Sequence, residues 1–204
     1  LRNEVTTIDK AVSLIGMNSV MAIVMAVGLY GGTSAAPRLV VESIRKQSLA
    51  VAALTRAVAR VEGITGADRD TALLAGMLHD CGKLVLATNW PDEYYEVARG
   101  DDLAMEAQLF GADHALIGAH LLSTWKLADA VVEAVAHHHR PSAGHFDSLG
   151  AAALVHIGHA LAHRPGNGTL PSIDMEMMGE FELWDHTGDW IAAAEELEYE
   201  AANR

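Results

Sequence analysis

Apolar residues recur along most of the chain at helical spacing, and no segment alternates apolar and polar residues over the length of a strand. The clearest pattern covers Leu39–Glu62, where apolar positions lie mostly three, four or seven residues apart, as on one face of a helix. Gly63 and Gly66 are expected to end this helix. The pattern therefore predicts an all-α protein.

Shorter helical patterns occupy most of the remaining chain. Asp68 or Asp70 is expected to cap a helix that starts at Thr71, and Pro91 suits a first helical position. The stretch Arg164–Gly168 is the best candidate for a long loop. The expected helices are Ile8–Ile15, Val20–Leu29, Thr71–His79, Pro91–Val97, Asp102–Phe110, His114–Trp125, Ala128–His138, Leu149–His163 and roughly Trp190–Ala202.

One uncharged segment, Ala11–Pro37, is long enough to be considered as a membrane-spanning helix. Its apolar run is interrupted at Gly16, Asn18 and Ser19, and the dense part, Val20–Val27, is short. The segment also lacks the basic start and the small-residue cleavage site of a secretory signal. Buried core helices are therefore favoured over a membrane segment.

Composition and charge narrow the functional classes. The chain has 204 residues with 27 acidic and 14 basic side chains, a net charge of −13, which disfavours nonspecific nucleic-acid binding. The acidic excess is greatest in residues 165–204, where Trp184 and Trp190 are expected to pack back onto the rest of the protein. Cys81 is the single cysteine, so an internal disulfide is excluded and a reducing, cytoplasmic compartment is expected.

Histidines suggest where chemistry could occur, because none precedes His79 and most follow it before residue 164. The adjacent pair His79-Asp80 is weak evidence alone, since neighbouring helical side chains point about 100° apart. Further histidines lie on three later predicted helices and favour a common polar site: His114, His138, His139, His156 and His159. Imidazole and carboxylate groups suit iron, manganese, nickel or zinc. Lys83, one turn past Asp80, could reach a phosphate anion.

The motif AGMLHDCGKL at Ala75–Leu84 resembles the core motif of the HD superfamily of metal-dependent phosphohydrolases. Other motifs narrow the resemblance to the HDOD family, the HD-related output domains of bacterial signalling proteins. They are Ile8–Gly16, Gln47–Ala52, Phe110–His114 with Gly118, Trp125–Leu127 and Val132–Pro141. The resemblance covers roughly residues 1–163 and implies an HD-like multi-helix bundle. Residues 164–204 would form an acidic extension packed on it, and the family's first helices, which normally precede Leu1, would be missing.

The same resemblance implies a degenerate metal site. Catalytic HD proteins take their first ligand from an upstream histidine, and Gln47 occupies the probable equivalent position, where a neutral amide is a poor ligand. His159 occupies the position expected for a closing aspartate, and Pro141–Phe146 lacks the Gly-Tyr-Pro motif of the related cyclic-di-GMP phosphodiesterases. Lys83 is the candidate catalytic residue. The candidate metal ligands are His79, Asp80, His114, His138, His139 and His159.

The function that the resemblance implies is a non-enzymatic output module for signal transduction in bacteria. Its expected partners are proteins, an upstream receiver or sensory domain above all, with neither nucleic-acid binding nor membrane insertion. No cofactor is expected beyond a weakly bound divalent ion of iron, manganese, nickel or zinc. The alternative is a metal-dependent phosphohydrolase that acts on a phosphoester such as a cyclic dinucleotide.

Overall fold

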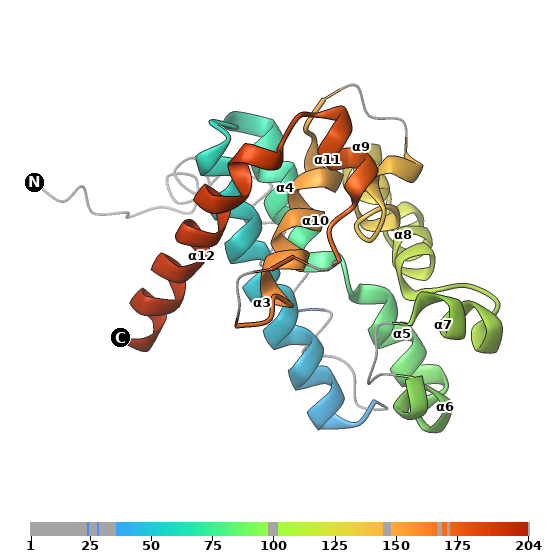
Figure 1. Ribbon diagram of the computed structural model, residues 1–204. Helices are drawn as coiled ribbons and strands as arrows, with labels where there is room; N and C mark the ends of the chain where they lie inside the picture. Colours follow the sequence, from blue (N-terminus) through green and yellow to red (C-terminus); the bar gives the residue numbers. More distant parts are fainter. Residues whose placement is uncertain are drawn as a thin grey trace, which may run out of the picture.

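The computed structural model describes residues 24, 28, 36–97, 102–144, 148–166, 169–170 and 172–203, and every regular element among them is helical (Figure 1). The predicted all-α fold is therefore confirmed. The expected helix Ile8–Ile15 lies outside the described residues, as does Val20–Leu29 except for Val24 and Gly28. The elements are α3 (Arg38–Val61), α4 (Gly66–Leu78), α5 (Cys81–Asn89), α6 (Pro91–Val97), α7 (Leu103–Phe110), α8 (His114–Thr124), α9 (Asp129–Ala136), η1 (Pro141–Ala143), α10 (Ala151–Ala162), α11 (Met175–Glu180), η2 (Trp184–His186) and α12 (Thr187–Ala202).

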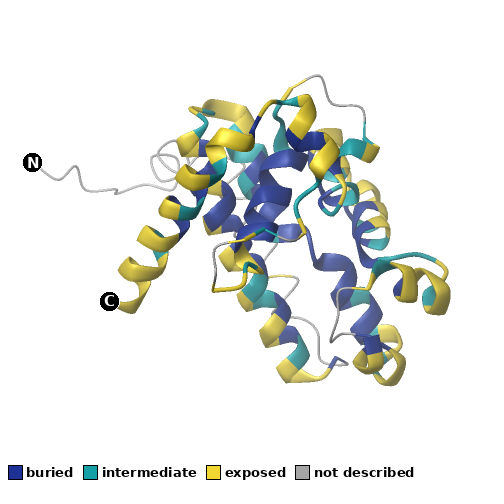
Figure 2. Ribbon diagram, in the orientation of Figure 1, coloured by how far each residue is buried: buried dark blue, intermediate teal, exposed yellow. Residues whose placement is uncertain are grey.

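Helix α10 runs through the centre of the bundle, and every residue from Ala152 to Leu161 is buried (Figure 2). It packs against α3, α4 and α9. Helix α10 approaches α3 closely at Gly158, where an added Cβ would lie 2.9 Å from the backbone nitrogen of Thr55. The glycine therefore allows the two central helices to touch backbone to backbone.

The turn between α3 and α4 differs in part from the expected one. Gly63 ends α3 as predicted: its φ is +69°, and it donates to the carbonyl of Arg60 while Ile64 donates to that of Ala59. Gly66, however, begins α4 rather than ending α3. The helix thus starts five residues before Thr71, and neither Asp68 nor Asp70 is its N-cap.

A bend at His79-Asp80 separates α4 from α5, a helix that the apolar pattern did not predict. Near its start, α5 crosses α8 at Gly82 and Gly118. A Cβ added to Gly82 would lie 2.8 Å from the nitrogen of Gly118 and would collide with the carbonyl of His114. This crossing brings the bend directly against the first turn of α8.

The acidic C-terminal residues join the hydrophobic core through α11 and α12. Trp190 is fully buried beside Val58 and Ile157, and its indole N–H donates to Glu62 at 2.6 Å. The expectation is wrong for Trp184, which is 46% exposed because Leu183 occupies the inward position next to it. Helix α11 was not predicted, since six residues are too few for a recognisable period.

No helix in the described part of the chain combines the length and the apolarity needed to cross a membrane. The uncharged segment Ala11–Pro37, which raised that question, lies almost entirely outside the described residues.

Candidate metal centre

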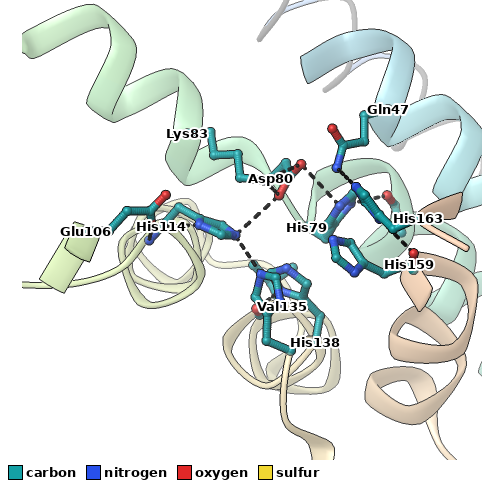
Figure 3. Close-up of polar contacts among 12 residues, drawn as sticks. Gln47, His79, Asp80, Lys83, Glu106, His114, Val135, His138, His159 and His163 are labelled. Atoms are coloured by element: carbon teal, nitrogen blue, oxygen red, sulfur yellow. Dashed lines mark hydrogen bonds and ion pairs between the residues drawn. The ribbon is translucent and has the colours of Figure 1, made fainter. Parts of the chain in front are cut away.

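His79 and Asp80 point from the bend between α4 and α5 into the interior, and both are fully buried (Figure 3). His79 donates its Nδ1 proton to the carbonyl of Gly76 at 2.9 Å. Its Nε2 therefore faces Asp80 Oδ2, 3.3 Å away, without hydrogen-bond geometry. The other carboxylate oxygen, Oδ1, lies 3.4 Å from Nε2 of His114. The bend thus places one carboxylate between two imidazoles.

Lys83 sits one turn into α5 and is turned inward, so that its ammonium lies 3.1 Å from each oxygen of Asp80. It is only 5% exposed, so it faces the carboxylate rather than the solvent. Burial raises the pKa of Asp80, but the neighbouring His79 and the Lys83 ammonium outweigh that effect and hold the pKa well below its ordinary value. Asp80 is therefore ionised and is paired with a cation of the protein itself.

His114, the first residue of α8, is fixed from behind by Glu106 of α7. One carboxylate oxygen of Glu106 accepts both the backbone N–H and the Nδ1 proton of His114, each at 2.7 Å. Nε2 of His114 is thereby directed to the centre, where Nε2 of His139 lies 3.0 Å away. Glu106 was missed from the sequence, although it is the only charged residue of its helix.

His138 lies at the middle of the cluster, immediately after α9, and is fully buried. Its Nδ1 proton goes to the carbonyl of Val135 at 2.7 Å, and among the described residues nothing hydrogen-bonds to its Nε2. Burial, followed by the neighbouring histidines His139 and His79, holds its pKa well below the ordinary value. His138 is therefore a neutral imidazole with an inward lone pair, the form that binds metals.

Two overlapping histidine triads share His138. In each triad the donor atoms lie within 4.8 Å of one another; the triads are His79, His138 and His159, and His114, His138 and His139. Three imidazoles suit a single zinc, nickel or iron ion. Neither triad includes a carboxylate, and Asp80 is already paired with Lys83. The residues therefore fit one ion and do not fit a two-metal centre, which needs anionic ligands to hold two divalent cations about 4 Å apart.

Gln47 on α3 contacts the cluster indirectly, through His163. Its side-chain amide donates to Nε2 of His163 at 2.8 Å. His163 in turn donates its Nδ1 proton to the carbonyl of His159 at 2.8 Å, and the two rings lie 4.2 Å apart. The predicted equivalence of Gln47 to the missing ligand stays a prediction, as do the ligand roles of the histidines.

Two other residues near the cluster have structural roles. His156 donates its Nδ1 proton to the carbonyl of His138 and accepts the backbone N–H of Asp174, both at 2.8 Å. It therefore ties α10 to the end of α9 and to the start of α11. Cys81 is fully buried beside Gly118, and burial raises the pKa of its thiol to about 12, so it is no nucleophile at neutral pH.

An all-helical bundle with a buried His-Asp bend and histidines converging on it from later helices defines an HD-type domain. The model of the HDOD domain family matches residues 1–141, and the chain belongs to this family. The resemblance predicted from the sequence motifs is thus confirmed. No curated protein matches the sequence.

Solved structures share the fold. A candidate phosphohydrolase of Shewanella amazonensis SB2B is 22% identical with a TM-score of 0.67, over 96% of this chain and 73% of its own. An HDOD domain protein with unknown function from Geobacter sulfurreducens is 21% identical with a TM-score of 0.61, over 96% and 76%. A candidate signal transduction protein of Marinobacter aquaeolei VT8 is 22% identical with a TM-score of 0.67, over 98% of this chain and 48% of its own. Such low identities support the fold alone.

Proposed function

We propose that this chain is a signal-transduction module of the bacterial cytoplasm that acts by binding other proteins and does not hydrolyse phosphoesters. The observation that carries the proposal is the buried pair of Asp80 and Lys83, with the ammonium 3.1 Å from both carboxylate oxygens. The positive charge of this ammonium balances the negative charge of the Asp80 carboxylate, which a pair of divalent ions would otherwise need as a ligand. The partner class that we propose is an upstream receiver or sensory domain.

Two-metal hydrolysis places the attacking water and the leaving group between two ions. A metal that bound Asp80 here would share the carboxylate with the buried ammonium of Lys83, and the two cations would repel each other. The remaining inward donors are imidazoles, and an imidazole adds no negative charge. We therefore propose that these residues stabilise the fold and do not catalyse hydrolysis.

A single divalent ion is the most that we propose for the triads that share His138. His79 and His159 would complete the ligand set on one side, and His114 and His139 would do so on the other. When bound, such an ion would act as a Lewis acid. Because Asp80 remains paired with Lys83, binding is expected to be weak.

A hydrolysis assay tests the proposal directly. The full chain is incubated with Mn²⁺ or Fe²⁺ and with either bis(4-nitrophenyl) phosphate or cyclic di-GMP. We expect no turnover above a protein-free control, and the same result for Asp80→Asn. Turnover in the native chain that Asp80→Asn abolishes would favour the alternative, a metal-dependent phosphohydrolase acting on a phosphoester.

A further inference from the structure

We propose that a groove on the outer face of α3 and α4 binds an amphipathic helix of a partner protein, with apolar residues at one end and acidic residues at the other. The groove has a volume of about 530 Å³. The turn at Gly63, Ile64 and Thr65 borders it, and Leu197 of α12 contributes to its wall. It lies on surfaces that the candidate metal centre does not use.

The groove changes in character along its length. Its α3 wall is a stripe at helical spacing, Leu49, Ala53, Arg56 and Arg60, and its α4 wall is Arg69, Leu73 and Met77. The two helices run in opposite directions from their shared turn, so Arg60 and Arg69 are close to the turn while Leu49 and Met77 are far from it. One end is therefore basic and the other apolar.

Arg56 and Arg60 are available to an anionic partner, whereas Arg69 pairs with the neighbouring Asp70 at 3.2 Å. Arg60 pairs with Glu196 at 3.2 Å, but both side chains are more than 60% exposed, at 67% and 62%. Such exposed pairs are weak and can exchange with carboxylates of a ligand. Arg56 makes no hydrogen bond or ion pair with any residue in the described ranges, and it projects from an exposed position of α3. The attraction for an acidic partner comes from the local charge of Arg56, Arg60 and Arg69, since the protein as a whole carries a net charge of −13.

The dimensions fit a short helix. The α3 stripe from Leu49 to Arg60 extends over about 16 Å at 1.5 Å per residue, which matches three turns of a bound helix. Apolar side chains at positions i, i+3 and i+7 of that helix would cover the exposed Leu49 and the half-buried Leu73 and Met77. Acidic residues in its last turn would meet the arginines, and the negative end of its dipole would add to that attraction.

The inference rests on the proposed function, because it specifies the surface through which a binding module meets its partner. The groove is also close to the histidine cluster in the chain, since Met77 lies in its wall and His79 follows two residues later. The opposite face of α3 packs on α10, the helix that carries His159. The groove is thus connected to the histidine cluster through α4, which ends just before His79, and through α3, which packs on α10.

The experiment measures fluorescence anisotropy of a labelled 14-residue peptide added to the full chain. The peptide carries leucines at i, i+3 and i+7 and three glutamates in its last turn. A control peptide replaces the glutamates with glutamines. Arg56→Glu reverses the charge within the groove, Ala53→Gln fills its exposed floor, and Arg38→Glu is a matched charge reversal at the other end of α3. Circular dichroism verifies that each variant is folded.

We expect saturable binding that Arg56→Glu, Ala53→Gln and the glutamine peptide each weaken about tenfold, with Arg38→Glu within about twofold of the native chain. Absence of saturable binding, or binding that Arg56→Glu leaves unchanged, would overturn the proposal. So would displacement of the peptide by cyclic di-GMP or inorganic phosphate, which would indicate an anion site, or a dimer in sedimentation that Arg56→Glu dissociates. Phosphoester turnover is measured separately, so failure of the proposed function is distinguishable.

Discussion

At the scale of single residues, the histidines around Asp80 are oriented by contacts on their outer sides. His79 and His138 each donate to a carbonyl three residues earlier, and His114 donates to Glu106. Because each Nδ1 proton is engaged, each Nε2 faces the interior, as in histidines that ligate metals. All of these contacts lie within the protein, so the fold itself orients the three rings.

Glu106→Ala is predicted to lower the free energy of unfolding by about 3 kcal/mol, because it leaves two buried donors of His114 without an acceptor. Glu106→Gln keeps an acceptor oxygen and should cost less. Urea denaturation followed by circular dichroism measures both variants. Equal stability of the alanine variant and the native protein would show that Glu106 does not support His114.

Gln47→His is predicted to tighten binding of Mn²⁺ or Fe²⁺ by adding an imidazole beside His163 and the histidine cluster. Titration calorimetry measures the affinity, with Gln47→Ala as the control for loss of the amide. Unchanged affinity in a folded Gln47→His variant would mean that Gln47 is not the missing-ligand position.

The sequence predicts which residues form the cluster, but it does not predict which of their side chains contact one another. The motifs identify His79, Asp80, His114, His138 and His139, and the structure brings all of them together. The inward turn of Lys83 onto Asp80 could not be predicted, since a spacing of three residues places two side chains on one helix face but does not choose between a neighbour and the solvent. Glu106 was missed because its contact spans separate helices.

At the scale of elements, the site depends on the bend after α4 and on the crossing of α5 with α8. The apolar pattern does not predict helix α5, because its residues from Cys81 to Leu84, together with Leu86 and Ala87, are all buried. A helix that is buried on most sides has no polar face and hence no clear period. The start of α4 differs from the predicted one for another reason: Gly66 begins the helix at positive φ, whereas a glycine after a helical pattern predicts its end.

Gly82→Ala is predicted to destabilise the protein by more than about 3 kcal/mol, because the added methyl group meets backbone atoms of His114 and Gly118 that cannot rotate away. The matched control is Gly179→Ala in α11, where an added Cβ has nothing within 4 Å. That variant should be neutral or slightly stabilising. Urea denaturation compares the two, and a well-folded Gly82→Ala protein of native stability would contradict the described crossing.

The contact between η2 and the end of α3 is predicted to depend on pH. His186 donates to Glu62 at 2.9 Å, and this hydrogen bond, with the negative charge of Glu62, raises the pKa of His186 above its ordinary 6.5. A raised pKa means that the stabilisation is complete below pH 6.5 and is lost as the pH rises through the higher folded-state value. His186→Asn should therefore lower the urea midpoint at about pH 5.5 and leave it unchanged at about pH 9. A constant difference at both pH values would argue against the charged contact.

At the scale of the whole molecule, the C-terminal residues and the bundle share one hydrophobic cluster. Met177, Met178 and Trp190 pack with Leu54 of α3 and Leu154 of α10. The compositional change after residue 163 therefore does not mark a break in packing, although a domain boundary there stays a prediction. The charge distribution along the sequence predicts the acidic extension. The structure shows how the extension is attached to the bundle, through the buried indole of Trp190.

We propose that Asp80 of this HDOD protein, with its carboxylate paired with Lys83, does not hold a two-metal centre. The most direct test is the metal content of the full chain by mass spectrometry, after purification without added metal and again after dialysis against Mn²⁺ and then buffer. The proposal predicts at most one ion per chain, lost on dialysis, and no difference between the native protein and Asp80→Asn. Two ions per chain that survive dialysis and disappear in Asp80→Asn would contradict the claim.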